Sequence, residues 1–585
     1  MSTQAAGEDA PDTVTPSTGA PAGAPAGVAQ PLHGVGVSPG LAAGPVAQVR
    51  PPAGEPPAGP AVAEEQAEAE AARIAAAADA VRSALEQAAT TVEGERRELL
   101  ETTAQMAADP TLVKSASALV RAEHLPAPRA VWQAAGKVAE QLAALGGYMA
   151  ERAKDVADVR NRIIAELTGQ PMPGVPQRSE PFVLVATDLA PADTALLDPA
   201  LVRAIVTAEG GPTSHTAILA RALGIPAVVG LAGAPAALPE GELVLVDGGA
   251  GTVELSPDPE RVRRAEERRT VVRTFDGRGR TADGHEVALL ANVGDPDGAR
   301  AAAEAGAQGV GLFRTEFCFL DRTEEPGIDE QAEQYRRVLE QFPGKKVVVR
   351  TLDAGADKPL PFVTDAEEAN PALGVRGLRT ARKAPEVLEN QLAAIARAAG
   401  TTSADVWVMA PMVATVPETE EFVAACERHG LGTAGVMVEV PSAALLAGPI
   451  LARASFASIG TNDLTQYAMA ADRLLGSLAE LSDPWQPAVL RLVESTCLGG
   501  AQQSRPVGVC GEAAADPALA VVLVGLGISS LSMTPRALAD VAAVLAATDL
   551  ATCRRLARAA VDAESAADAR ARVREGLPVL ADLGL

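Results

Sequence analysis

Short apolar runs recur along the carboxyl-terminal half of the chain, each ending in polar residues or glycine. After residue 285 there are eight of them: VALLANV, VGLFRTEF, KVVVRTLD, VWVMAPMV, GVMVEVP, FASIGTNDL, VGVCGE and SLSMTP. Helical stretches such as EQAEQYRRVLEQF and VLENQLAAIARA separate most of them. Because strand and helix alternate eight times over about 300 residues, the pattern predicts a TIM (β/α)8 barrel spanning residues 276–585.

The amino-terminal half shows two further patterns. Residues 33–60 and 170–256 contain short apolar runs punctuated by glycine, with a helix among the later ones, which predicts an α/β layer domain. Between them, residues 61–169 have a helical period, in which larger apolar residues such as Ile74 and Val81 lie seven apart among charged positions. We therefore expect an α/β multidomain protein, in which a helical bundle is inserted between the two segments of the α/β domain and the barrel follows.

Two segments are expected to lie outside these domains. Residues 1–32 are rich in Ala, Pro, Gly, Ser and Thr and lack any apolar period, which predicts a disordered tail. Residues 257–275 carry a high density of Arg and Glu, which is typical of a solvated linker helix.

Composition narrows the class of protein. The 585-residue chain is 48% hydrophobic and has a formal charge of −25, which argues against a nucleic-acid partner and suits a basic protein partner. Five cysteines without a CxxC spacing argue against a disulfide framework or a zinc site. No apolar span reaches about 18 residues and no signal-peptide pattern opens the chain, so we expect a soluble cytoplasmic protein without membrane insertion.

The segment GGPTSHTAILARAL, which begins at Gly210, contains the first candidate for chemistry. Its two glycines permit a tight turn, a hydroxyl residue (Thr213 or Ser214) can cap a helix, and the helix begins near His215. Free N–H groups and the dipole at a helix amino terminus would stabilise a phosphoryl group on a ring nitrogen of this histidine. A neutral imidazole is also a nucleophile near neutral pH. The alternative is a capping or structural histidine.

Polar side chains end most of the apolar runs of the predicted barrel, where TIM-barrel active sites lie. They are Asn292, Arg314, Arg350 with Asp353, Glu439, Asn462 with Asp463, and Cys510 with Glu512. A set of cationic side chains is expected to converge there, which suits a compact, multiply charged anion. The set comprises Arg314, Arg350, Arg376, Arg473 and Lys358.

Glu439 and Asp463 follow adjacent strands of the predicted barrel. Mg²⁺ typically takes one or two carboxylates together with phosphate and water, so the pair predicts a Mg²⁺ site. Alternatively, both carboxylates belong to surface salt bridges. Cys510, taken alone, is interpreted as a small buried residue at a strand end, as free cysteines commonly are.

Several of these segments resemble one enzyme family. GGPTSHTAI followed by LARALGIPAVVG is similar to the phosphohistidine segment of Enzyme I of the bacterial phosphotransferase system, the phosphoenolpyruvate-protein phosphotransferases. The segments GLFRTEF, VVRTLDAGADKPLP, NPALGVRGLR, GVMVEVPSAA, SIGTNDLTQYAMAADR and GVCGE resemble the same family. One departure is Pro212, which stands where the family often carries a basic residue.

The resemblance implies a swivelling phosphohistidine domain, an inserted helical bundle that docks the carrier protein HPr, and a barrel that binds phosphoenolpyruvate (PEP) and forms a homodimer. His215 would accept the phosphoryl group, Thr194 would orient its imidazole, and Cys510 would protonate the methylene carbon as pyruvate forms. The other positions carry over as substrate contacts and Mg²⁺ ligands. Arg314, Arg350, Arg376 and Arg473 would clamp the substrate, Asn462 would contact its phosphate, and Glu439 with Asp463 would bind the metal. Asp463 and Lys358 are also expected to contact the substrate.

The implied activity is transfer of the phosphoryl group from PEP to His215 and then to a histidine of HPr, the first step of sugar uptake by this system. Since one histidine must visit two sites, rigid-body motion about residues 257–275 is expected. Two alternatives stay open. One is a pyruvate phosphate dikinase or PEP synthase, although the chain shows no glycine-rich nucleotide loop. The other is a catalytically idle homologue that binds HPr and signals.

Overall fold

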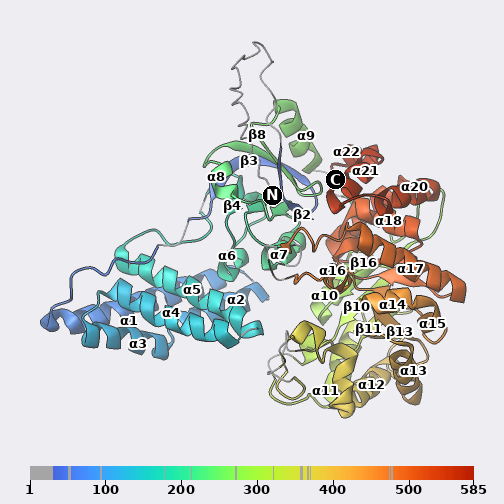
Figure 1. The fold of residues 1–585 in the computed structure, drawn as a ribbon, viewed down its shortest axis with the longest axis horizontal. Helices are drawn as coiled ribbons and strands as arrows, with labels where there is room; N and C mark the ends of the chain where they lie inside the picture. Colours follow the sequence, from blue (N-terminus) through green and yellow to red (C-terminus); the bar gives the residue numbers. More distant parts are fainter. Residues whose placement is uncertain are drawn as a thin grey trace, which may run out of the picture.

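The protein is described by a computed structural model. It describes residues 31–50, 54–92, 95–145, 147–176, 178–211, 214–269, 273–319, 322–355, 360–364, 368, 370–473, 475 and 478–585. Figure 1 shows a helical bundle, a sheet-containing domain and a carboxyl-terminal barrel, with the sheet domain between the other two.

A mixed sheet forms the centre of the α/β domain. Its strands are β1 Leu32–His33, β2 Val35–Ser38, β3 Leu41–Gln48, β4 Phe182–Ala186, β5 Val202–Thr207, β6 Ala227–Val229, β7 Leu243–Asp247 and β8 Thr252–Leu255, in the order β1-β8-β7-β3-β4-β5-β6-β2. Parallel pairing of β3 with β4 joins the segments on either side of the bundle. Val183 packs on one face of the sheet and Leu184 on the other, because successive strand residues point to opposite faces.

Short helices connect the strands of this sheet: α6 Pro191–Ala195, α7 His215–Leu223 and α8 Ala234–Ala237. Helix α9, Pro259–Arg269, follows the last strand. Its charged positions form ion pairs such as Arg263 with Glu260, whereas Ala265 is buried against Ala43 and Leu245. One stripe of the segment predicted to be a solvated linker therefore packs on the α/β domain.

The helical bundle consists of α1 Ala67–Ala89, α2 Glu95–Ala107, α3 Pro110–Glu123, α4 Ala127–Leu145 and α5 Gly147–Thr168. Ile74 and Val81 are buried in its core, as the helical period predicts. The bundle is joined to α6 by Arg162 of α5, whose guanidinium contacts Asp158 at 2.8 Å and Asp193 at 2.6 Å. Ala192 and Ala195 of α6 extend the same apolar core.

The carboxyl-terminal half is a closed barrel of parallel strands, so the predicted fold class is confirmed. The strands are β9 Ala288–Val293, β10 Gly309–Arg314, β11 Lys346–Arg350, β12 Asp405–Ala410, β13 Ala434–Val438, β14 Ala457–Ile459, β15 Val507–Val509 and β16 Ser530–Met533. Each pairs with the next, and β16 closes on β9. These are the eight strands expected from the apolar runs.

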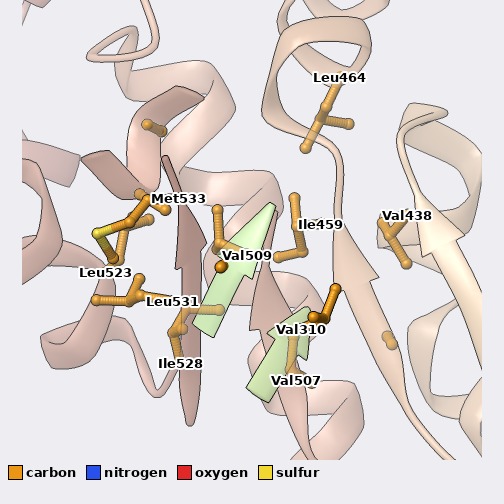
Figure 2. Packing of buried hydrophobic residues seen from close by; sticks show 14 of the residues in the cluster. Val310, Val438, Ile459, Leu464, Val507, Val509, Leu523, Ile528, Leu531 and Met533 are labelled. Atoms are coloured by element: carbon orange, nitrogen blue, oxygen red, sulfur yellow. The ribbon is translucent and has the colours of Figure 1, made fainter. Parts of the chain in front are cut away.

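Helices surround the strands of the barrel. They are α10 Pro296–Glu304, α11 Ile328–Leu339, α12 Pro385–Gly400, α13 Val416–Arg428, α14 Pro441–Leu445, α15 Ala447–Leu451, α16 Thr461–Met469, α17 Pro487–Gln503, α18 Pro517–Leu526, α19 Leu538–Ala546, α20 Leu550–Val561, α21 Ala566–Glu575 and α22 Pro578–Leu583. Figure 2 shows Val509 of β15 beside Leu531 of β16 and Leu523 of α18 in the layer between strands and helices. Among the described residues, none of the helices is both long and apolar enough to cross a lipid bilayer.

Candidate active site

Helix α7 starts at the candidate histidine. The turn before it uses Gly210 at φ 93°, a conformation that favours glycine. The Ser214 hydroxyl then accepts a hydrogen bond from the N–H of Ala217 at 3.3 Å and caps the helix, so Ser214 is the observed cap of the two candidates. Residue His215 is the first of α7, as predicted, whereas Pro212 and Thr213 lie outside the described residues.

The turn before α7 lies against the barrel. A Cβ atom added to Gly211 would lie 3.4 Å from the Cβ of Ala479 and 3.7 Å from the carbonyl oxygen of Arg473. Figure 1 shows α7 on the side of the α/β domain that faces the barrel. The backbone at the amino terminus of α7 is thus adjacent to a loop that carries one of the candidate substrate arginines.

Thr194, the residue expected to orient the imidazole, lies in α6 and is fully buried. Helices α6 and α7 contact each other, so the fold brings the two segments together. The neighbouring Asp193 is fixed by its ion pair with Arg162. Burial raises the pKa of Asp193 to about 6, although the Arg162 guanidinium opposes this shift. The position of Thr194 therefore depends on the helical bundle as well as on the sheet.

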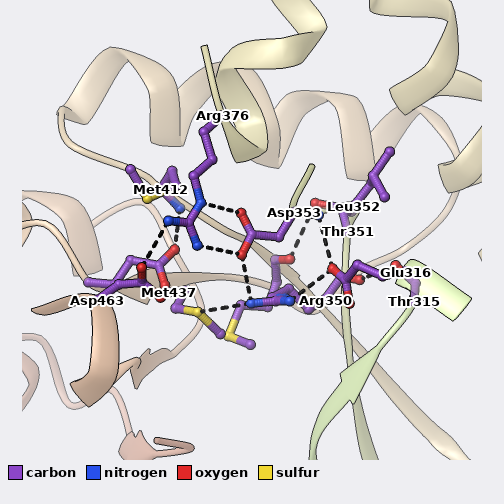
Figure 3. A network of polar contacts seen from close by, with 12 residues as sticks. Thr315, Glu316, Arg350, Thr351, Leu352, Asp353, Arg376, Met412, Met437 and Asp463 are labelled. Atoms are coloured by element: carbon purple, nitrogen blue, oxygen red, sulfur yellow. Dashed lines mark hydrogen bonds and ion pairs between the residues drawn. The ribbon is translucent and has the colours of Figure 1, made fainter. Parts of the chain in front are cut away.

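A buried network of arginines and carboxylates lies at the carboxyl ends of the barrel strands. The Arg376 guanidinium binds Asp353 through Nε and Nη2, both at 3.2 Å, and Asp463 through Nη1 at 2.9 Å. Figure 3 shows this guanidinium between the two carboxylates. Arg473 binds the second oxygen of Asp463 at 3.1 Å. Two candidate substrate arginines therefore share one candidate metal ligand.

Arg350 extends the network at the end of β11. Its guanidinium binds Glu316 at 2.8 Å and Asp353 at 3.0 Å. Burial alone would lower the pKa of Arg350, but the two carboxylates raise it above the ordinary value, so the cation is retained. No atom of the described residues accepts a hydrogen bond from its buried Nε. A buried donor without a partner is costly, and an anionic ligand would satisfy it.

Glu439, after β13, is 1% exposed, and its Oε1 accepts a hydrogen bond from the N–H of Met412 at 2.6 Å. Gly460 makes room for this carboxylate, because a Cβ there would lie 2.9 Å from Oε2. Burial, together with the charges of Asp353 and Asp463, raises the pKa of Glu439 to about 8, although Arg350 and Arg376 oppose this shift. A cation placed between these carboxylates would favour their ionised forms.

Cys510, directly after β15, is buried inside the barrel with Met409 and Met437. Its thiol lies 3.6 Å from the carbonyl oxygen of Ile459. Burial raises the pKa of Cys510 to about 11, so the thiol carries its proton at neutral pH. The group is thereby suited to donate a proton rather than to act as a thiolate nucleophile.

The remaining predicted residues lie around the same end of the barrel, which we call the barrel mouth, with one exception. Arg314 is exposed at the end of β10, in register with Arg350. The Asn462 side chain accepts a hydrogen bond from the N–H of Glu512 at 3.3 Å, which ties the loops after β14 and β15 together. Lys358 lies outside the described residues.

Two contributors to the site were not predicted from the sequence. Glu316, in the 3₁₀ turn after β10, binds Arg350 and also accepts the N–H of Asp353 at 3.1 Å. Ser532 of β16 donates to Asn292, which in turn donates to the carbonyl of Cys510. The same strand-end pattern could have identified Glu316, which follows Arg314 by two residues. Ser532 lies within its strand and gives no such signal.

The site has the donors and acceptors that a small anion and a hard cation require. Guanidinium groups supply paired N–H donors to carboxylate or phosphate, and Glu439 with Asp463 supplies oxygen ligands. Within the described ranges there is no group of three or more His, Cys, Asp or Glu arranged to hold a metal. Two carboxylates together with oxygens from a substrate and water match the usual coordination of Mg²⁺.

Comparisons with known proteins identify the family of the chain. The model of the PEP-utilising enzyme PEP-binding domain matches residues 228–550, the N-terminal model matches residues 33–152, and the mobile-domain model matches residues 178–251. An NMR structure of an Enzyme I protein is 34% identical, with a TM-score of 0.37 over 40% of this chain and 97% of that chain.

Two curated relatives match over most of their length. The phosphoenolpyruvate-protein phosphotransferase of Streptomyces coelicolor is 51% identical over 545 residues, which cover 92% of this chain and 98% of the relative. The protein of the same name from Haloferax volcanii is 40% identical over 507 residues, which cover 84% and 89%. With its histidine helix adjacent to an arginine-lined barrel mouth, the chain belongs to the phosphoenolpyruvate-protein phosphotransferase family of PEP-utilising enzymes.

Proposed function

We propose that this protein transfers the phosphoryl group of PEP to His215 and then to a histidine of the carrier protein HPr, the first step of sugar uptake by the phosphotransferase system. The main support is the position of α7, because the turn that precedes it lies at Gly211 against the loop that carries Arg473. The nucleophile would thereby reach a substrate held by the guanidinium groups of the barrel. We expect both partners in the cytoplasm, as for the family.

The chemistry follows from the charges at the mouth. A ring nitrogen of His215 attacks the phosphorus of PEP, a nitrogen–phosphorus bond forms, and the bond from phosphorus to the enol oxygen breaks. Arg350 and Arg376, which both bind Asp353, would bind the anionic groups of the substrate. Because they are pre-ordered, little reorganisation accompanies the build-up of charge in the transition state. The amino terminus of α7 stabilises the phosphoryl group after transfer.

Glu439 and Asp463 would hold Mg²⁺ in this site. When bound, the metal supplies positive charge to the transferring phosphoryl group. Asp463 is bonded to Arg376 and Arg473 in the structure, so metal binding would replace one of these contacts. The short contact from the Met412 N–H holds the Glu439 carboxylate in place.

Cys510 is the proposed acid for the second part of the reaction. The enolate left after phosphoryl transfer takes the thiol proton at its methylene carbon and becomes pyruvate, and the thiolate regains a proton from water. Pyruvate is far more stable as the ketone than as the enol. The protonation therefore favours phosphorylation of His215 over the reverse reaction.

The proposal is tested with radiolabelled PEP, Mg²⁺ and purified protein. We expect about one labelled phosphoryl group per chain, stable to alkali and labile to acid as a phosphohistidine is, with one pyruvate released for each. On addition of HPr the label should move to HPr. If the protein bound HPr but took up no label, the idle homologue would replace this proposal. If uptake required a nucleotide, a dikinase or synthase would replace it.

Replacing Cys510 with Ala should slow pyruvate formation by about 10²- to 10⁴-fold, the usual contribution of a general acid. Stereospecifically labelled PEP turned over in deuterated water should give a chiral methyl group with the parent protein and a racemic one with the variant. The raised pKa keeps the Cys510 thiol protonated up to pH about 10. Between pH 7 and 9, loss of this proton should therefore not lower the rate of pyruvate formation by the unsubstituted protein. Cys497→Ala, at a buried thiol of α17, is the matched control and should behave as the parent. Retained stereospecificity in Cys510→Ala would remove the thiol from this step.

We also propose that two copies of the chain associate through the barrel, as in the family. Leu445 of α14 is 69% exposed and Leu498 of α17 is 59% exposed, although both are large apolar side chains. The two helices contact each other, and Ser495 donates to the carbonyl of Ala444 at 3.0 Å. Exposed apolar surface of this kind commonly marks an interface.

The Leu445→Glu/Leu498→Glu variant should therefore scatter light as a single chain, whereas the parent has about twice that mass. Leu243→Glu, at an exposed apolar position of β7, is the control and should stay dimeric. A parent protein with the mass of one chain would contradict the proposed dimer.

A further inference from the structure

Two arginine contacts hold α7 against the barrel. Arg221 of α7 forms an ion pair with Glu512, with 2.9 Å between Nε and Oε2. At the end of the same helix, the guanidinium of Arg536 donates to the carbonyl oxygen of Leu223. We call these two interactions the docking contacts. Both contacts hold the last turn of the helix that begins at His215.

The contact of Arg536 suits a helix end. The last carbonyl groups of a helix lack partners within the helix and carry the negative end of its dipole, so a guanidinium from another domain is attracted there. Gly224, which caps α7 at φ 66°, also leaves space for it, because a Cβ there would lie 2.5 Å from Nη1 of Arg536. A side chain at position 224 would obstruct the contact.

The contact of Arg221 reaches the active site. Glu512 follows Cys510 by two residues in the loop after β15, and its N–H donates to the side chain of Asn462 at 3.3 Å. The carboxylate that receives Arg221 thus belongs to the loop that carries the proposed proton donor. Seating of α7 is thereby linked to the loops that surround the substrate.

The apolar cores of the barrel and of the α/β domain are separate from each other. Buried apolar clusters lie within the barrel, from Val287 to Leu580, and within the α/β domain, from Val35 to Val229 and from Ala42 to Val253. Between the domains lies a cavity of about 350 Å³ whose lining includes Arg221, Arg536 and Asp540. Polar contacts around a cavity hold domains together less firmly than a continuous apolar core, which is the property a moving domain needs.

We propose that Arg221, Glu512 and Arg536 are positioning residues for phosphoryl uptake from PEP alone: they seat α7 over the barrel mouth and separate before transfer to HPr. The inference rests on the proposed function, because it assigns the contacts to one of its two half-reactions. These residues touch neither substrate nor reacting atoms in this role. Their loss should therefore lower the fraction of docked molecules and leave the chemistry of the separated domain intact.

The substitutions that test the proposal are made in the barrel rather than in α7. Arg221 also donates to the carbonyl of Val37 within its own domain, so its replacement would disturb that domain directly. Glu512→Gln removes the charge, keeps the side-chain shape and retains the backbone bond to Asn462. Combined with Arg536→Ala, it removes both docking contacts. Glu494→Gln is the matched control, because it removes a 2.6 Å ion pair with Arg558 that lies within the barrel.

The two half-reactions are measured separately. In a single turnover with PEP and Mg²⁺, uptake by Glu512→Gln/Arg536→Ala should be about 10- to 100-fold slower, as for loss of charge-assisted hydrogen bonds. After long incubation the variant is fully phosphorylated, and its transfer to HPr should then match the parent within about twofold. Equal slowing of both half-reactions, or parent-like uptake, would overturn the proposal.

Solution scattering tests docking without any reaction. Without ligands, the double variant should have a larger radius of gyration than the parent, and Glu494→Gln should not. If the parent took up no phosphoryl group, the proposed function would fail while the scattering result still tested the docking contacts. An unchanged radius in the double variant would count against them whatever the outcome of the labelling.

Discussion

His215→Ala is expected to take up no phosphoryl group from PEP and to pass none to HPr. The position combines the first turn of α7, capped by Ser214, with a turn that lies against the loop carrying Arg473. Free N–H groups at this helix end stabilise a phosphoryl group only if the nucleophile places it there. Loss of a covalent nucleophile removes the whole route, so the expected loss exceeds that of any substrate contact.

The measurement is acid-labile label per chain after incubation with radiolabelled PEP and Mg²⁺. A matched control is His429→Ala, which removes a histidine from the barrel surface, where its Nε2 lies 2.7 Å from Glu389. This control should be labelled as the parent is. PEP binding by His215→Ala should persist, since the substrate contacts belong to the barrel. Equal labelling of His215→Ala and parent would show that another residue carries the phosphoryl group.

Arg376→Ala is expected to lose both PEP uptake and stability of the barrel. The guanidinium is 2% exposed and neutralises Asp353 and Asp463, which are themselves buried. Removing one partner of a buried ion pair costs about 3–5 kcal/mol, because it leaves uncompensated charge. Here Asp353 and Asp463 each lose one of two guanidinium partners, since Arg350 and Arg473 remain. Both lie near Glu439, whose pKa is raised by burial and by these two negative charges. The urea midpoint of the barrel transition and the single-turnover rate of uptake measure the two effects.

The two effects of Arg376 can be separated with further variants. Arg376→Lys keeps a charge but not the planar fork that binds both carboxylates, so it should recover little uptake. Arg376→Met combined with Asp353→Leu should recover much of the stability, because an apolar pair of similar volume is often as stable as a buried ion pair. The same double variant should remain inactive. Parent-like uptake by Arg376→Ala would exclude this arginine from the substrate site.

The buried network of arginines and carboxylates is rich in charge because it orders the guanidinium groups that are proposed to bind the substrate. Asp353 binds Arg350 and Arg376 at once and therefore orders two guanidinium groups before substrate arrives. Ordering them costs stability that an apolar barrel mouth would retain, yet it removes most of the reorganisation that substrate binding would otherwise require. The Nε of Arg350, which meets no acceptor among the described residues, is a donor ready for the ligand.

The sequence by itself determined the architecture and the candidate chemistry. The eight apolar runs became the eight barrel strands because alternation of strand and helix is a local, periodic signal. The period seen at Ile74 and Val81 likewise identified the face of α1 that is buried in the bundle. The glycine pair and hydroxyl residues placed the start of α7 at His215, since caps and turns depend on neighbouring residues.

Only the tertiary structure decided which side chains meet. The pairing of Arg376 with Asp353 and Asp463, the support of Arg350 by Glu316, and the contact of Arg221 with Glu512 join residues from different loops or domains. Sequence periodicity states which face a residue occupies, but not which distant partner lies opposite it. Partners are fixed by barrel closure and by docking of the α/β domain, which bring together segments far apart in the chain.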